Sequence, residues 1–186
     1  MELSELGKTP ISEDKPAGQD PSYEPEFEEL EAEIEKMISP SSTETADWNK
    51  VVRLSSSILA EKAKDLRVAS RLAVARIQLD KLDGFLDGVR LFADLIENFW
   101  DKLYPPKKRM RGRMGAIEWW LEKTEGLLGQ EEPTPTPAEK LDELKGELKR
   151  LDSLFIDNLK DPPMLRSLER YIESIPAIEP ETPEPE

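Results

Sequence analysis

The sequence predicts an all-α protein, a multi-helix bundle of about five core helices followed by a carboxy-terminal helical pair. Apolar residues recur at three- and four-residue steps through most of the chain, which is typical of amphipathic helices. The strict alternation typical of strands appears nowhere, and the 16 prolines gather mainly at the two ends and in one internal stretch. We divide the chain into an extended arm (1–24), a helical domain (25–129), a Pro-rich linker (130–136), a two-helix unit (137–175) and an acidic, Pro-rich disordered tail (176–186).

The first three helices of the domain have recognisable starts. Pro25 can be the first residue of a helix that continues to about residue 38, because the N–H it lacks is not needed there. Asp47 and Asp65 are suitable N-caps for the second and third helices. The third helix carries alanines at 69, 73 and 75, which would allow a neighbouring helix to approach closely.

The fourth helix, from about Gly84 to Tyr104, is predicted to be the centre of the domain because its apolar residues cover most of its circumference. Gly84 and Gly88 are four residues apart and favour a close packing notch over a phosphate-binding loop. Pro105-Pro106 ends the helix, and a fifth amphipathic helix extends to about residue 128.

Two further helices are predicted beyond the linker. The segment 136–139, Thr-Pro-Ala-Glu, is typical of a capping box, and the helix that it starts carries leucines at coiled-coil spacing. This seam comprises Leu141, Leu144, Leu148, Leu151, Leu154 and Phe155. A last short helix is predicted to start at Asp161-Pro162, and the pair either packs back on the domain or dimerises.

Composition excludes several classes of function. The chain has neither Cys nor His, so disulfides, thiol chemistry and the commonest ligands for zinc, copper or iron are absent, and we expect no cofactor. Net charge is −14, with a mildly basic middle between acidic ends, which disfavours nucleic acid. No segment approaches the roughly 20 apolar residues of a membrane span, and the start does not resemble a secretory signal. We expect a cytoplasmic protein with no membrane insertion.

No catalytic arrangement is found. Four acids, Asp80, Asp83, Asp87 and Asp94, flank one apolar helix and are explained by its solvated face, although paired carboxylates can hydrolyse glycosides. The serines lack a base, and no loop clusters carboxylates for a divalent cation. We therefore predict that the protein is not an enzyme.

The candidate binding residues are a basic loop and a tryptophan pair. The loop comprises Lys107, Lys108, Arg109, Arg111 and Arg113, and it is either a solvated loop or a site for an acidic partner, including the chain's own acidic arms. Trp119 and Trp120 point about 100° apart on a helix, so one of them must leave the apolar stripe and could anchor a partner. Arg67 is predicted to pair with a carboxylate and lock two helices together.

Several segments, in this order and spacing, resemble the amino-terminal ImpA-type domain of the TssA family, a part of the bacterial type VI secretion system. They are PISEDKPAGQDPSYEPEFEELEAEI (10–34), Asp47-Trp48, KDLRVASRLAVARIQLDKLDGFLDGVRLFADLIENFWDKLYPP (64–106) and AIEWW (116–120). The second of the long segments contains Arg67 and ends in Trp100, Tyr104 and Pro105, to which we assign structural roles. Residues 137–175 match no family that we identify.

The resemblance implies a non-enzymatic assembly protein that works in the cytoplasm and is recruited to the inner membrane through partners. The implied partners are sheath, baseplate or membrane-complex proteins of the secretion system, and a homo-oligomer is left open. The loop after Tyr104-Pro105-Pro106 is variable or acidic in the family but basic here, which favours a different partner. The alternative is a generic helical adaptor that binds acidic peptides or a membrane surface through this loop.

Overall fold

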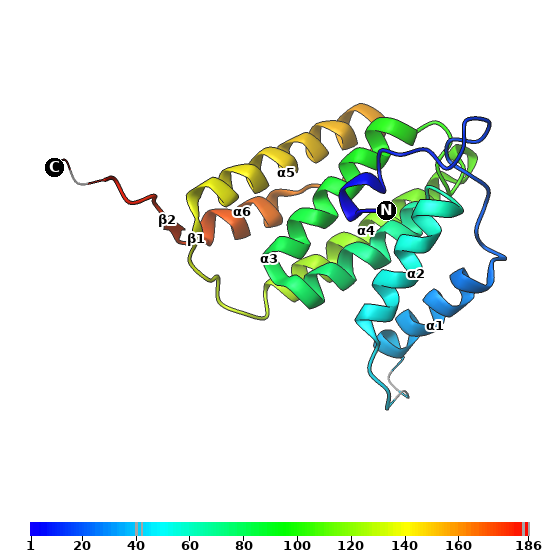
Figure 1. Cartoon of the computed structure of the whole chain (residues 1–186), viewed down its shortest axis with the longest axis horizontal. Helices are drawn as coiled ribbons and strands as arrows, with labels where there is room; N and C mark the ends of the chain where they lie inside the picture. Colours follow the sequence, from blue (N-terminus) through cyan, green and yellow to red (C-terminus); the bar gives the residue numbers. More distant parts are fainter. Residues whose placement is uncertain (40, 42, 184, 186) are drawn as a thin grey trace.

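The computed structural model describes residues 1–39, 41, 43–183 and 185, and it confirms the all-α fold class. Figure 1 shows α3 in the middle of the bundle, where it contacts α2, α4 and α5. Within the described residues the helices are η1 (Leu3–Glu5), α1 (Pro25–Ile38), α2 (Trp48–Glu61), α3 (Leu66–Phe99), η2 (Lys107–Arg109), α4 (Met110–Leu128), α5 (Ala138–Asn158) and α6 (Arg166–Ser174). Two very short strands, β1 (Thr136–Pro137) and β2 (Ala177–Ile178), complete the fold.

Helix α3 is a hairpin of two helical arms and not one straight rod. Asp80 and Lys81 have non-helical backbone angles, and Lys81 has φ of 50°, a left-handed conformation that is uncommon outside glycine. The arms, residues 66–79 and 82–99, correspond to the third and fourth helices that the sequence predicts. The second arm ends at Phe99 and not at Tyr104, which lies in an extended segment.

The two arms approach so closely because glycine faces small or backbone groups. A Cβ atom on Gly84 would lie 1.9 Å from the carbonyl oxygen of Arg76, and one on Gly88 would lie 2.9 Å from Ala73 Cβ. These contacts pair residues whose numbers add to about 160, so the arms are antiparallel. The predicted packing notch is confirmed, and an alanine of the first arm fills it.

Helix α1 is fastened to α2 by a buried carboxylate. Glu33 is 3% exposed and accepts hydrogen bonds from the backbone N–H of Asp47 (3.1 Å), from Lys36 Nζ (3.0 Å) and from Lys50 Nζ (3.2 Å). Burial raises the pKa of Glu33, but the Asp47 N–H and the two ammonium groups outweigh burial and lower this pKa to about 2. Asp47 also caps α2 by accepting from Lys50 N–H, as the sequence predicts.

Helices α5 and α6 pack back on the domain and extend its hydrophobic core. Five members of the predicted seam are buried, whereas Leu154 is only partly buried. Ion pairs border the seam: Arg150 contacts Asp94 (2.8 Å) and Glu97 (2.7 Å), and Arg90 pairs with Glu143. The neighbouring helix α6 buries Leu168 and Ile172 in the same core.

Three local predictions for the carboxy-terminal part are wrong. The capping box does not form, because Pro137 occupies the N-cap position and the Thr136 hydroxyl donates to the carbonyl oxygen of Thr134 (2.8 Å). Thr136 instead donates its backbone N–H to Pro176 O (2.9 Å), within a parallel pairing of β1 with β2 that the sequence pattern did not indicate. The last helix begins at Arg166, five residues after Asp161, since Pro162 and Pro163 remain outside it.

Residues near both ends of the chain make contacts that an extended arm and a disordered tail would not make. Within residues 1–24, η1 contacts α3 and the side chain of Leu6 is fully buried. At the other end, residues 177–178 pair with β1, while residues 184 and 186 of the predicted disordered tail lie outside the described residues.

Candidate partner-binding surface

Three extended segments cross at one end of the bundle and form what we call the junction: residues 16–19, 62–66 and 103–105. Lys64 N–H donates to Ala17 O (2.9 Å), and Gln19 N–H donates to Lys62 O (3.1 Å). On the other side, Tyr104 N–H donates to Lys64 O (2.8 Å), and Leu66 N–H donates to Tyr104 O (2.8 Å). The junction therefore joins segments that are far apart in sequence through their backbones.

Lys64 is the buried cation at the centre of the junction, and sequence reasoning missed it. Its side chain has no exposed surface, and Nζ donates to Leu6 O and Leu59 O, both at 2.7 Å. The ammonium lies 5.4 Å from the centre of the Phe99 ring. Burial lowers the pKa of Lys64 to about 8. Lys64 thus ties the amino-terminal arm to α2.

Arg113 is the second buried cation, and it differs from the exposed role predicted for it. The guanidinium is fully buried and donates to three backbone carbonyls: Pro105 (2.6 Å), Trp100 (2.7 Å) and Leu103 (2.8 Å). It also stacks 4.5 Å from the Trp100 ring. Burial lowers the pKa of Arg113 to about 10. Arg113 therefore cannot contact a partner; it fixes the segment that leads into the basic loop.

The remaining four bases, Lys107, Lys108, Arg109 and Arg111, are exposed and are called the basic loop from here on. Lys107 contacts Asp101 at 2.5 Å, but the other three make no ion pair with any described residue. Arg109 is the N-cap residue of α4 without a side-chain cap bond, and the first turn of α4 carries no acid. The N-terminal end of the helix macrodipole is positive, and the basic side chains beside it add to that charge. An incoming carboxylate would therefore be stabilised here.

One tryptophan of the pair is buried and the other is partly exposed, as expected for neighbours that point about 100° apart on a helix. Trp120 is fully buried and stacks on Phe92, with ring centroids 4.6 Å apart. Trp119 is half-buried, and the guanidinium of Arg71 lies 4.2 Å from the centre of its ring. Arg71 also holds Glu31 of α1 through Nε (3.1 Å) and Nη2 (3.2 Å). Trp119 is thus the member of the pair that reaches the surface.

The residues predicted to be structural gather around the junction. Arg67 contacts Asp65 (2.7 Å) and Asp20 (3.5 Å), and its guanidinium lies 4.9 Å from the Phe27 ring of α1. It therefore connects the start of α3 to the arm and to α1. Tyr104 is half-buried, and its hydroxyl donates to Gly18 O (3.3 Å). Trp100 and Pro105 offer their carbonyls to Arg113, as described above.

The four aspartates on α3 that the sequence singles out are all engaged in ion pairs. Each of the four aspartates on α3 contacts a base: Asp80 and Asp87 pair with Arg76, Asp83 with Lys140, and Asp94 with Arg150. No group of three or more acids among the described residues could hold a metal ion. Among the residues that the structure describes, no helix is long and apolar enough to cross a membrane.

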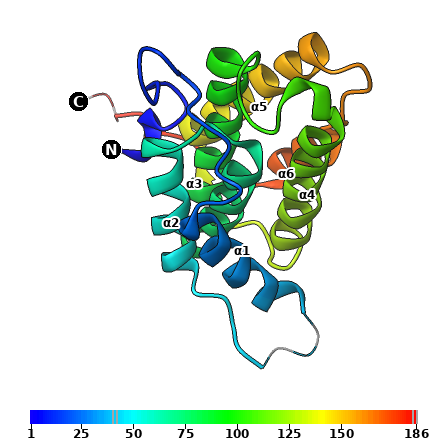
Figure 2. The same ribbon diagram turned by 90° about the vertical axis from the view of Figure 1, so that its right-hand side faces the viewer.

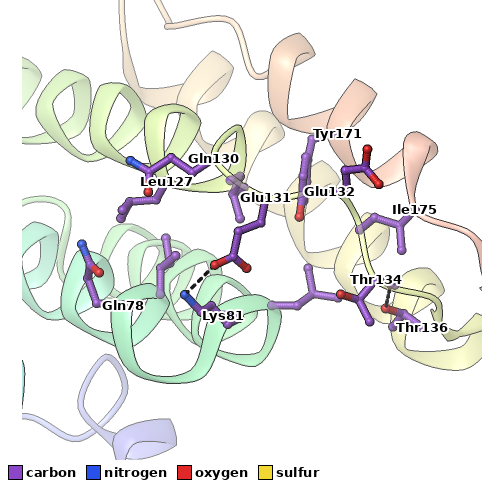
Figure 3. Close-up of a pocket in the computed structure, with 13 residues that line it drawn as sticks. Gln78, Lys81, Leu127, Gln130, Glu131, Glu132, Thr134, Thr136, Tyr171 and Ile175 are labelled. Carbon is purple, nitrogen blue, oxygen red and sulfur yellow. Dashed lines mark hydrogen bonds and ion pairs between the residues drawn. The ribbon is translucent and has the colours of Figure 1, made fainter.

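One cavity of about 130 Å³ lies where the linker crosses α3, α4 and α6. Figure 3 shows Lys81 and Glu131 facing each other across it, with a contact of 3.4 Å, and Tyr171 and Thr136 on its other walls. Burial and the Glu131 carboxylate raise the pKa of Tyr171. The cavity is smaller than the several hundred Å³ usual for small-molecule sites. We interpret it as a packing gap beneath the linker.

Comparison with known proteins identifies the family. The family model described as ImpA, N-terminal, type VI secretion system matches residues 8–122, which is more than half of the chain. The chain belongs to this family. The matched range includes the junction, the basic loop and both tryptophans of the pair, so the site described above lies within the ImpA-type domain.

Two relatives extend the comparison. The type VI secretion system component TssA1 of Pseudomonas aeruginosa is 36% identical over 101 residues, which cover 51% of this chain and 29% of that protein. The chain thus spans less than a third of that relative's length. The solved N-terminal domain of the TssA component from Burkholderia cenocepacia, which includes the conserved ImpA_N region, has a TM-score of 0.78 at 21% identity, with 94% of this chain and 90% of that chain covered. The shared fold therefore continues past residue 122 into the carboxy-terminal helices.

Proposed function

We propose that this ImpA-type domain is a non-enzymatic docking module of a type VI secretion system. Its basic loop would bind an acidic surface of a sheath, baseplate or membrane-complex protein. Such a module would act in the cytoplasm and reach the inner membrane through its partners. The family supports the secretion system, and the observation that carries the docking surface is the contrast between the buried Arg113 and the exposed bases around it.

That contrast matters because a rigid support lowers the cost of binding. The three carbonyl contacts of Arg113 and the backbone bonds of Tyr104 hold the segment before the basic loop in one conformation. A preorganised loop loses less conformational entropy when a partner arrives than a mobile loop does. Lys108, Arg109 and Arg111 could then form charge-assisted hydrogen bonds with carboxylates, which are stronger than bonds between neutral groups.

Binding measurements with purified secretion proteins test this proposal. The double charge reversal K108E/R109E should weaken binding to the partner by about tenfold or more, mainly at low salt. The matched control is K145E/K149E, which changes net charge equally on the exposed side of α5 and should leave binding unchanged. Equal binding by wild type and K108E/R109E would contradict the proposal, provided that both melt at the same temperature.

Anionic vesicles separate the adaptor alternative from the secretion module. Lys and Arg clusters bind acidic lipid at about 1 kcal/mol per residue, so a membrane-binding loop would sediment with vesicles that contain phosphatidylserine. We expect the protein to remain in the supernatant. Loop-dependent sedimentation, together with no binding to any secretion protein, would favour the alternative.

A further inference from the structure

The end of the bundle shown in Figure 2 carries two surfaces of opposite charge. α1 lies in the lower part of this view, and the chain between α3 and α4, which includes the basic loop, lies in the upper part. Five acidic residues and one basic residue of α1 are not buried, whereas residues 101–112 expose five basic residues and one acid. The face is therefore acidic on one side and basic on the other.

Several charges on this face have no partner within the described residues. On α1, Glu28, Glu29 and Glu35 make no ion pair there, and all three are exposed. Glu28 and Glu35 are seven residues apart, so they lie on the same side of the helix about 10 Å apart along its axis. The counterpart is the unpaired trio of the basic loop, Lys108, Arg109 and Arg111. The two unpaired sets are opposite in sign.

Beside α1 lies a strip of half-buried aromatic rings that stack on arginines already paired with acids. Phe27 of α1 and Trp119 of α4 are both half-buried, and they stack on Arg67 and Arg71 of α3. Arg71 pairs with Glu31, and Arg67 pairs with Asp65 and Asp20. Half-exposed aromatic rings inside a charged rim are typical of the centre of a protein interface.

We propose that this face binds the same face of a second copy of the chain through a two-fold axis. Rotation by 180° places the basic loop of one copy against α1 of the other, and the reverse contact forms at the same time. A single acidic partner would satisfy only the basic loop, whereas a second copy satisfies both ends and covers the aromatic strip. The inference rests on the basic loop as the docking element of the proposed function. It adds that self-pairing and a secretion partner compete for that loop.

Charge-swapped variants test the pairing by sedimentation velocity. K108E/R109E/R111E has two acidic ends, and E28K/E29K/E35K has two basic ends, so each variant alone should be monomeric where wild type forms a dimer. An equimolar mixture should form a heterodimer, because both of its contacts are again between opposite charges. The wild-type dimer should weaken by about tenfold or more as salt rises from about 0.1 M to about 1 M. Circular dichroism should show unchanged folding, since all six side chains are exposed.

The result that overturns the pairing is a monomeric wild type at all concentrations, or a mixture of the two variants that stays monomeric. Its failure can be distinguished from failure of the proposed function. If the mixture stays monomeric while K108E/R109E/R111E loses its secretion partner and E28K/E29K/E35K keeps it, docking holds and self-pairing is wrong. If the mixture pairs but neither variant changes binding to secretion proteins, self-pairing holds and docking through the loop is wrong.

Discussion

The junction and the α3–α5 interface hold their segments to the bundle by different means. At the junction, backbone groups of three segments bond to one another, and two buried cations donate to carbonyls in or beside it: Lys64 to Leu6 and Leu59, and Arg113 to Trp100, Leu103 and Pro105. At the α3–α5 interface, a row of buried leucines is bordered by ion pairs at the surface, such as that of Arg150. The junction is specified by a few irreplaceable polar contacts, and the α5 seam by a repeated pattern.

This difference predicts which positions tolerate substitution. A leucine seam accepts many sequences of similar volume and pattern. A buried cation that satisfies three carbonyls accepts almost none, because each unpaired carbonyl would add its own desolvation cost. The junction and the basic loop lie within the range that matches the family model, whereas α5 and α6 lie beyond it.

The largest loss of stability is expected when Arg113 is replaced by Ala. The change leaves the carbonyls of Trp100, Leu103 and Pro105 without their donor and opens a void beside the Trp100 ring. We expect the free energy of unfolding to fall by about 3–5 kcal/mol. Urea denaturation measures it. The control Arg111→Ala should stay within about 0.5 kcal/mol of wild type; a loss below about 1 kcal/mol in Arg113→Ala would show that the junction is not held as described.

A smaller loss is expected at the seam. Leu148 is 1% exposed, so Leu148→Ala removes buried methyl groups and leaves a cavity between α5 and α3. The free energy of unfolding should fall by about 2–4 kcal/mol. Lys149→Ala, on the exposed side of the same turn, is the control and should be nearly neutral. If the Leu148→Ala protein unfolds in two separate steps, α5 and α6 form an independent unit.

The pH dependence of stability reports on Lys64. The pKa of its amine is about 8 in the folded protein against 10.5 for an unperturbed lysine, so between these values the unfolded chain binds more protons. Stability therefore rises with pH across this interval, by about 3 kcal/mol in total. Below about pH 8 the folded protein carries the full cost of burying the charged amine. Lys64→Met removes the titrating group. The unfolding free energy of wild type minus that of this variant should become more positive from pH 8 to 10.5. A difference that stays constant over this range would show that Lys64 does not titrate with a lowered pKa.

The smallest effect concerns the ion pairs at the seam. Arg150 contacts Asp94, Glu97 and Glu147 from a partly exposed position. Burial lowers the pKa of Arg150, but its hydrogen bonds with Asp94, Glu97 and Glu147 outweigh burial and raise it. Arg150→Ala should cost about 1 kcal/mol at low salt and less at about 1 M salt. Lys145→Ala, exposed on the same helix, provides the baseline. A cost that salt does not reduce would show that Arg150 acts through packing and not through charge.

Pattern and spacing predicted the helices, the caps at Asp47 and Asp65, and the notch at Gly84 and Gly88, because these depend on neighbours in sequence. They could not predict that Lys64 and Arg113 are buried, since this depends on carbonyls supplied by distant segments. In the sequence, Arg113 is one base in a charged run. It differs from Arg111 only in lying on the inner face of α4. The exposed members of the basic loop were predicted from charge alone.

Hydrogen–deuterium exchange of the domain, with and without a purified secretion partner, would locate the docking surface. We expect the partner to protect backbone amides in and around residues 107–111 and to leave the exposed side of α5 unchanged. Protection confined to α5 and α6, with unchanged exchange at residues 107–111, would show that the basic loop is not the docking surface.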